Sequence, residues 1–154
     1  LARWFMGEVE SVYSIGATLA YPEIKTINDI DNAVVSLRFN SGALGAIDIS
    51  RNGVYGYDIR TEILGTSGTL KIGYLRETPL FVMTRDGINH DTVPYFPERF
   101  EQAYVSQLQD FVNSVLQDKN PSVTCADGVA ALNLSVAATQ SYKEGRPVKL
   151  DSNS

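Results

Sequence analysis

The sequence predicts an α+β protein with an open, largely antiparallel β-sheet and helices packed on one face. Hydrophobic residues alternate with polar ones through much of the first half of the 154-residue chain, as half-buried strands require. From residue 98 onward the hydrophobic spacing changes to three and four, which indicates amphipathic helices. Strands that come first and helices that follow favour α+β over an alternating α/β fold.

The two ends of the chain look different from its middle. Leu1, Trp4 and Phe5 share a helical face, and Gly7 suits the position just after a helix end. So short a helix without an N-cap would be marginal alone, so we expect the last turns of a helix that begins upstream. Residues 1–154 are therefore expected to form a single domain that is a fragment of a larger protein, with 151–154 as a frayed tail.

The first strands are predicted around a tight turn. Val9–Leu19 alternates loosely and indicates a strand, whereas polar Tyr21–Ile30 indicates a loop. Every second residue from Ala33 to Phe39 is hydrophobic, which predicts a strand with one buried face. Asn40–Gly42 then supplies the turn into a second strand, Ala43–Ser50.

More strands extend this antiparallel meander. Tyr57–Leu64 alternates again, and Gly65–Gly68 turns the chain into Thr69–Ile72. A further hairpin is predicted from Pro79–Thr84 and Ile88–Val93, which flank an Asp-Gly turn. We expect the rest of the chain to pack on these strands or to extend them.

Two helices and an edge strand follow. The apolar spacing predicts a long amphipathic helix over Glu98–Gln117. A second helix, capped by Thr124 or Asp127, is expected to reach Tyr142 and to end near Gly145. Residues 148–150 are predicted to add a short edge strand.

Composition excludes several classes of partner. The net charge of -5 argues against nucleic acid, because binding to a phosphate backbone needs clustered Lys and Arg. The apolar runs are far too short to span a membrane, so no membrane partner is expected. A single cysteine allows no internal disulfide, which fits a cytoplasmic localisation.

Cysteine, metal and nucleotide chemistry have weak support. Cys125 and His90 lie in different elements and lack an orienting group, so we interpret Cys125 as a buried small residue and His90 as a surface imidazole. Asp29, Asp31 and Asn32 lack the length and glycine of a calcium loop, and a solvated turn is expected there. No metal site is predicted. Because no glycine-rich phosphate loop occurs, the main fold for any nucleotide would lie elsewhere.

The strongest local candidate for ligand contact is Tyr55-Gly-Tyr57-Asp58, together with Arg60. A tyrosine hydroxyl both donates to and accepts from a polyol hydroxyl. Cross-strand packing of the tyrosines is the alternative, and chemistry alone favours it. Arg99 and Tyr104 are a second polar pair at the start of the long helix, where snorkelling surface side chains are the default interpretation.

Several of these segments together resemble a known family. Leu1-Ala-Arg-Trp, Ile47-Asp-Ile-Ser-Arg and Tyr55-Gly-Tyr-Asp-Ile-Arg-x-Glu-Ile-x-Gly-x-x-Gly68 occur in order. They resemble the C-terminal domain of the Gfo/Idh/MocA oxidoreductases, and most closely the inositol 2-dehydrogenases. The resemblance extends from residue 1 to about residue 150.

The resemblance implies an NAD- or NADP-dependent parent enzyme that oxidises a ring hydroxyl of a cyclic polyol or sugar to a ketone. In that family a Rossmann domain binds the cofactor, and the catalytic residues precede Leu1, so none is expected in this chain. The fragment alone is therefore expected to be inactive.

The resemblance also implies site residues and a partner. Tyr57 matches a residue that faces the polyol, Asp58 and Arg60 belong to the same motif, and Arg99 and Tyr104 match a pattern near the cofactor cleft. The outer sheet face, which includes Val34 and Leu64 in this chain, is expected to form a homodimer or homotetramer interface.

Two other hypotheses remain open. One is a stand-alone dimerisation or carbohydrate-binding module without catalysis. The other is a related enzyme that acts on another sugar, including a reductase that uses NADP, because cofactor choice is set in the absent domain.

Overall fold

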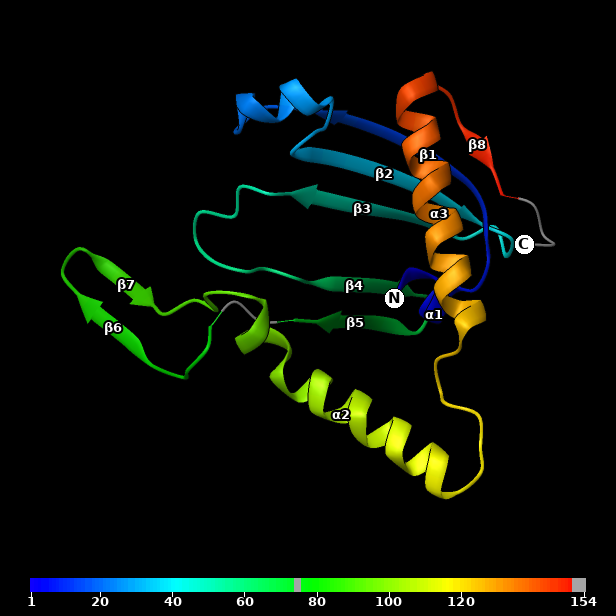
Figure 1. Cartoon of the computed structure of the whole chain (residues 1–154). Coiled ribbons are helices and arrows are strands. Elements are labelled where there is room, and N and C mark those ends of the chain that lie inside the picture. The colour runs from blue at the N-terminus through cyan, green and yellow to red at the C-terminus, as the bar shows by residue number, and fades with distance from the viewer. Residues whose placement is uncertain (74–75, 151–154) are drawn as a thin grey trace. The chain divides into compact units, whose positions relative to one another are not determined.

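The computed structural model describes residues 1–73 and 76–150, so the predicted tail at 151–154 lies outside the described residues. Figure 1 labels the helices and strands along the chain. The chain divides into two compact units. The first unit combines Leu1–Asn52 with Asn120–Ser154, and the second comprises Gly53–Lys119.

The first unit contains a four-stranded antiparallel sheet in the order β3-β2-β1-β8. Its strands are β1 (Val9–Ala17), β2 (Asn32–Phe39), β3 (Leu44–Ser50) and β8 (Val148–Lys149). Gly42, with φ 86°, makes the turn between β2 and β3, a conformation that glycine adopts without steric cost. All four strands and this turn confirm the sequence prediction, including the edge strand at the C-terminal end.

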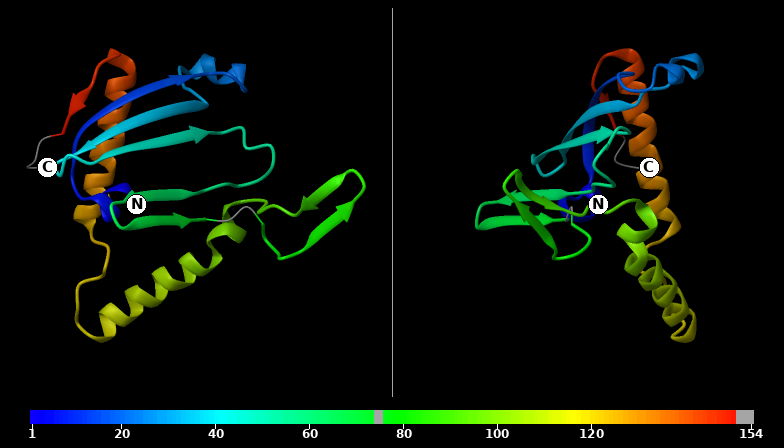
Figure 2. Two further views of the ribbon diagram at one scale, coloured as in Figure 1. Left: turned by 180° about the vertical axis from the view of Figure 1, so that it is seen from behind. Right: turned by 90° about the vertical axis from the view of Figure 1, so that its left-hand side faces the viewer.

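Helix α3 (Cys125–Glu144) covers one face of this sheet, as both views of Figure 2 show. The core residues come from alternate positions of the strands and from the facing side of the helix: Val9, Val12, Val35, Leu37, Phe39, Ala137 and Val148. The Ser141 hydroxyl also accepts a hydrogen bond of 3.0 Å from the Ser14 N–H of β1. The predicted buried face of β2 is thus confirmed.

Two short helices precede β2. Helix α1 (Ala2–Met6) ends at Gly7, as predicted, but Ala2 and Met6 pack against the core, whereas Trp4 is 73% exposed. The predicted loop at 21–30 contains a 3₁₀ helix, η1 (Pro22–Ile27). Proline at the first position and a left-handed Asn28 at the end make one short helix favourable there.

The solvated turn expected around Asp31 is wrong, because this side chain is only 1% exposed. Its carboxylate accepts hydrogen bonds from the backbone N–H groups of Leu19, Ala20 and Tyr21 and from the Asn32 amide, at 2.7–2.8 Å. Burial raises the pKa of Asp31, but these hydrogen bonds stabilise the anion and lower the pKa to about 2. Asp31 therefore fixes the turn between β1 and η1.

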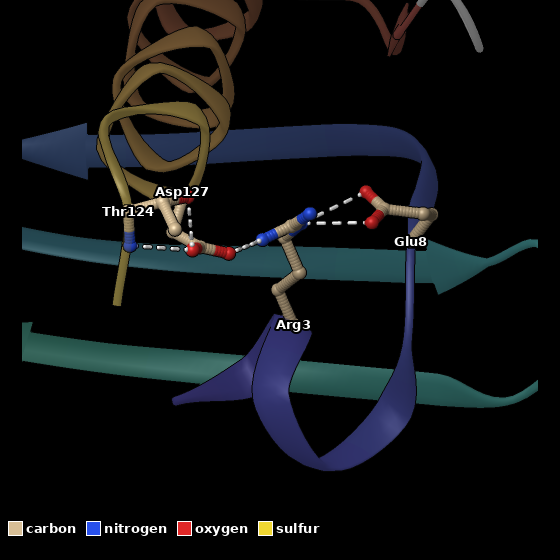
Figure 3. Close-up of polar contacts among 4 residues, drawn as sticks. All are labelled: Arg3, Glu8, Thr124 and Asp127. Atoms are coloured by element: carbon tan, nitrogen blue, oxygen red, sulfur yellow. Dashed lines mark hydrogen bonds and ion pairs between the residues drawn. The ribbon is translucent and has the colours of Figure 1, made fainter. Parts of the chain in front are cut away.

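Both candidate caps of α3 are used. Thr124 is the N-cap, and its N–H and hydroxyl donate to Oδ2 of Asp127 at 2.9 and 2.8 Å. The other oxygen of Asp127 accepts from Arg3 of α1 at 2.7 Å, and Arg3 also binds Glu8 at 2.8 Å (Figure 3). This chain of contacts ties α1 to the first turn of α3.

The second unit contains two hairpins and a long helix. The hairpins are β4 (Thr61–Gly65) with β5 (Gly68–Ile72), and β6 (Phe81–Thr84) with β7 (Gly87–His90). The helix is α2 (Phe96–Leu116), which confirms the predicted one. The expected continuous meander is instead divided among three separate sheets in the described residues, one of four strands and two of two strands.

Cys125 and His90, the two residues considered above for nucleophilic catalysis, are both at the surface. Cys125, expected to be buried, is exposed because it begins α3 just after its cap, whereas His90 is exposed as predicted. In the described part of the chain, no group of three or more His, Cys, Asp or Glu side chains could hold a metal ion. The described helices include none with the length and hydrophobicity to cross a membrane.

Candidate substrate-contact site

The segment from Gly56 to Arg60 precedes β4 and lies outside any ladder, although the alternation predicted a strand from Tyr57. The Tyr57 N–H donates to the buried Val93 carbonyl at 2.7 Å, so it bonds to a loop and not to a neighbouring strand. Gly56 has φ 127°, and a Cβ there would lie 2.5 Å from the same carbonyl. Only glycine allows this close approach.

The other end of the segment is held equally closely. Gly73, with φ 120°, brings its backbone so near Ile59 that a Cβ would lie 2.6 Å from the Ile59 carbonyl oxygen. Arg99 in the first turn of α2 donates from Nη2 to that same oxygen at 3.3 Å. The candidate segment is thus fixed at both ends by residues distant in the sequence.

Tyr57 lies among three aromatic rings from the start of α2. Its ring centroid is 5.9 Å from that of Tyr95, 6.4 Å from Phe96 and 6.1 Å from Phe100. The contacts with Tyr95 and Phe100 are nearly perpendicular, at 83° and 84°, the edge-to-face geometry that the ring quadrupoles favour. These contacts fix the orientation of the Tyr57 ring.

Asp58 uses only one of its carboxylate oxygens within the described structure. Oδ2 accepts from the Tyr55 hydroxyl at 3.0 Å and pairs with Arg60 Nη2 at 2.8 Å. The Asp58 side chain is 12% exposed, and Oδ1 is buried without a hydrogen-bond partner among the described residues. A buried acceptor without a donor is costly, so Oδ1 is suited to accept a hydrogen bond from a ligand hydroxyl.

Arg60 and Tyr104 are more open to solvent. The Arg60 side chain is 62% exposed, and it lines an open groove of about 770 Å³ with residues of the neighbouring loop and hairpin: Gly73, Arg76, Glu77, Thr78, Pro79, Phe81 and His90. Tyr104 is 48% exposed, and among the described residues it makes no hydrogen bond or ring contact with the Tyr57 cluster. The structure therefore groups Tyr57, Asp58, Arg60 and Arg99, but not Tyr104.

Sequence reasoning missed two rings of this site, Tyr95 and Phe96. The segment that contains them appeared only as a break between a strand and a helix. The only sequence pattern that could have indicated them is two adjacent aromatic residues between Pro94 and Pro97, at the start of the helix. That signal indicates a packed helix start but does not reveal which segment the rings contact.

The described residues include no dinucleotide cradle of the Rossmann type. Such a cradle is a glycine-rich turn that leads from a strand into a helix N-terminus. The two long helices begin after Tyr95 and Thr124, without a preceding glycine-rich turn.

Comparison with known proteins identifies the family. Residues 1–150 match the model of the oxidoreductase family, C-terminal alpha/beta domain (Gfo/Idh/MocA). This chain belongs to that family, which confirms the resemblance read from the sequence motifs and the α+β fold class.

Two curated relatives match almost the whole chain. It is 39% identical over 152 residues to the scyllo-inositol 2-dehydrogenase (NAD(+)) of Bacillus subtilis, covering 98% of this chain and 44% of that protein. It is 42% identical over 153 residues to the myo-inositol 2-dehydrogenase of Thermotoga maritima, covering 98% and 46%. The chain thus spans less than half the length of these relatives.

Solved structures share the fold. A probable dehydrogenase from Thermotoga maritima is 42% identical with a TM-score of 0.91, covering 96% of this chain and 46% of that one. The scyllo-inositol dehydrogenase of Lactobacillus casei, solved with NAD(H) and scyllo-inositol, is 32% identical with a TM-score of 0.90, covering 96% and 44%.

Proposed function

We propose that this chain is the substrate-contacting and oligomerisation domain of an NAD(P)-dependent dehydrogenase that oxidises a ring hydroxyl of inositol or a similar cyclic polyol. The observation that supports this most is the match over nearly the whole chain to inositol 2-dehydrogenases at 39–42% identity. The cofactor and the catalytic residues would belong to a part of the protein outside this chain. NAD supplies the hydride acceptor, and this chain supplies contacts to the polyol.

In this proposal Tyr57, Asp58 and Arg60 contact the polyol. The Tyr57 hydroxyl donates to or accepts from a ring hydroxyl, and its ring is fixed by aromatic neighbours. The buried Oδ1 of Asp58 accepts from a second hydroxyl, which satisfies an acceptor that otherwise lacks a donor. Arg60 pairs with the other carboxylate oxygen at 2.8 Å and so orients the Asp58 side chain.

The proposal is tested in the intact protein that contains this chain. We expect myo- or scyllo-inositol to drive NAD reduction, measured by absorbance at the nicotinamide band. Replacing Tyr57 by Phe keeps the ring contacts and removes only the hydroxyl, so the KM for the polyol should rise roughly tenfold, as for a lost hydrogen bond of about 1.4 kcal/mol.

Three results would contradict parts of this proposal. Unchanged KM and kcat in the Tyr57→Phe variant would make Tyr57 a packing residue. Turnover of a polyol with NAD by the 154-residue chain alone would contradict the proposal that the chain is inactive by itself. An intact protein that binds a polyol but never reduces NAD or NADP would instead favour a carbohydrate-binding module.

The second part of the proposal concerns self-association through the face of the β1–β3 sheet opposite α3. Alternate residues of the strands project there, among them Tyr13, Ile15 and Val34, with Arg38 and Asp48 beside them. Ile15 and Val34 are register partners and are 55% and 43% exposed. An apolar centre with charged residues around it is typical of an isologous interface between copies of one chain.

A further inference from the structure

We propose that Arg99 is a positioning residue, which holds the Tyr57–Arg60 segment in the geometry that binds the polyol, and is not a cofactor contact. The inference rests on the proposed role of Tyr57. It replaces the assignment of Arg99 to the cofactor cleft that the sequence motif implied.

The first support is a contact with the backbone of the site. Arg99 Nη2 donates to the Ile59 carbonyl at 3.3 Å, and Ile59 lies between the polyol-contact candidates Asp58 and Arg60. This stretch has no ladder partner, because β4 begins only at Thr61. A charge-assisted hydrogen bond from α2 therefore restrains a carbonyl that no neighbouring strand holds.

The second support is a contact through the side chains. The Arg99 guanidinium carbon is 5.4 Å from the Phe100 ring centroid, within the range of a cation–π interaction. Phe100 in turn meets the Tyr57 ring edge to face at 6.1 Å. Arg99 is thus linked to Tyr57 by its backbone contact at Ile59 and by its ring contact at Phe100.

The position of Arg99 supports this assignment over cofactor contact. Its side chain is half-buried, and both contacts are made within the second unit of the chain. The aromatic residues of the first turns of α2 surround Tyr57, so the start of this helix packs on the candidate polyol site. Tyr104, the other residue assigned to the cofactor cleft, makes no hydrogen bond or ring contact with this cluster in the described part of the chain.

The test compares Arg99→Met with Arg99→Lys in the intact dehydrogenase. Met keeps an apolar stem but cannot donate to Ile59, whereas Lys keeps a cationic donor. We expect Arg99→Met to raise the KM for the polyol roughly tenfold and to leave the KM for NAD within about twofold, because a displaced contact group loses much of its interaction. Arg99→Lys should recover most of the lost affinity. Arg85→Met, in the exposed β6–β7 turn, is the matched control and should change neither constant.

Combining Arg99→Met with Tyr57→Phe tests whether Arg99 acts on polyol binding through Tyr57 or independently of it. If Arg99 acts through Tyr57, then Arg99→Met should add little to the polyol KM of a protein that already contains Tyr57→Phe. Full additivity of the two effects would overturn the proposal. A rise in the KM for NAD with an unchanged KM for the polyol would overturn it as well, and would restore the cofactor assignment.

Hydrogen exchange decides the question independently of turnover. The amides of Tyr57–Arg60 should exchange several-fold faster in Arg99→Met than in the wild type, and at nearly wild-type rates in Arg99→Lys and Arg85→Met. Unchanged exchange in Arg99→Met would overturn the positioning role. If the wild type reduces no NAD with any polyol, the proposed function fails, and the exchange measurement still tests the restraint by Arg99.

Discussion

Two acidic residues, Asp31 and Asp58, show how differently buried carboxylates can be used at the scale of single residues. Both oxygens of Asp31 accept hydrogen bonds, and three of the donors are consecutive backbone N–H groups. Asp58 has both of its described partners on one oxygen and a buried second oxygen without a partner among the described residues. Asp31 is therefore satisfied by the fold, whereas Asp58 has capacity left for a ligand.

Asp31 predicts a change of stability with pH. Its pKa is about 2 in the folded chain and about 3.9 in an unfolded chain, so its contribution is complete above pH 4 and is lost as the pH falls toward 2. Asp31→Asn should lower Tm by several degrees at pH 7 and remove this part of the acid sensitivity. Melting curves between pH 2 and 7 measure both effects. Asp29→Asn, at an exposed acid two residues before Asp31, should change little, and an equal loss in both variants would contradict the assignment.

Two glycines predict opposite effects of the same substitution. Gly56→Ala should destabilise the protein by about 1–3 kcal/mol, because the new methyl group meets the Val93 carbonyl and φ is positive. Gly128→Ala lies inside α3 with no atom within 4 Å of the new Cβ, so it should stabilise by about 0.5–1 kcal/mol. Urea unfolding of both variants measures the difference. A Gly56→Ala variant as stable as the wild type would contradict the first prediction, and a destabilised Gly128→Ala variant would contradict the second.

At the scale of elements, the first turn of α3 depends on α1. Asp127 receives the Thr124 N–H and hydroxyl and also pairs with Arg3. The Thr124 N–H, together with the Arg3 guanidinium, lowers the pKa of Asp127 to about 2. One carboxylate thus closes the helix start and anchors a neighbouring helix, so the loss of Asp127 should loosen both.

Asp127→Ala should therefore expose the start of α3 and the α1 helix to solvent exchange. We expect several-fold faster hydrogen exchange at the α1 amides and the first turn of α3, with the centre of α3 unchanged. Lowering the pH from 4 toward 2 should produce the same loosening in the wild type, because the carboxylate becomes protonated. Glu101→Ala, at an exposed acid of α2, is the control. Exchange that stays unchanged at α1 would contradict the tie through Arg3.

At the scale of the whole molecule, the outer face of the β1–β3 sheet predicts self-association. Ile15→Arg places a charge at the centre of the proposed interface, and burial of an unpaired charge there is costly. We expect the intact protein to become a smaller species in light scattering, with its monomer still folded. Ile27→Arg changes an isoleucine of η1 that is also exposed, at 73% against 55% for Ile15, and should leave the oligomer intact. An unchanged molecular mass in Ile15→Arg would place the interface elsewhere.

Local patterns in the sequence were sufficient to predict much of the fold. The alternation from Ala33 to Phe39 predicted a buried strand face, and Val35, Leu37 and Phe39 are indeed in the core. Gly42 and Gly145 were predicted at positions that need positive φ, and both have it. These features depend on neighbours within a few residues, because strand period, turns and caps are set by local backbone geometry.

The family motif identified Tyr57, Asp58 and Arg60 together as candidate site residues. The alternation of hydrophobic and polar residues, however, predicted that these three residues lie in a regular strand. Tertiary contacts overrode that prediction. Val93 and Arg99 take the hydrogen-bonding groups of this segment that a neighbouring strand would otherwise use. Because these partners lie more than thirty residues away, no local pattern could reveal them.

The sequence by itself determined the class of the elements, their order, the buried face of β2 and the family. Only the tertiary structure decided that Asp31 is buried, that Arg3 joins α1 to α3, and that rings from α2 surround Tyr57. The physical reason is the range of the interactions. Periodicity and turn chemistry act between neighbours in the chain, whereas the environment of a polar side chain depends on segments that folding brings together.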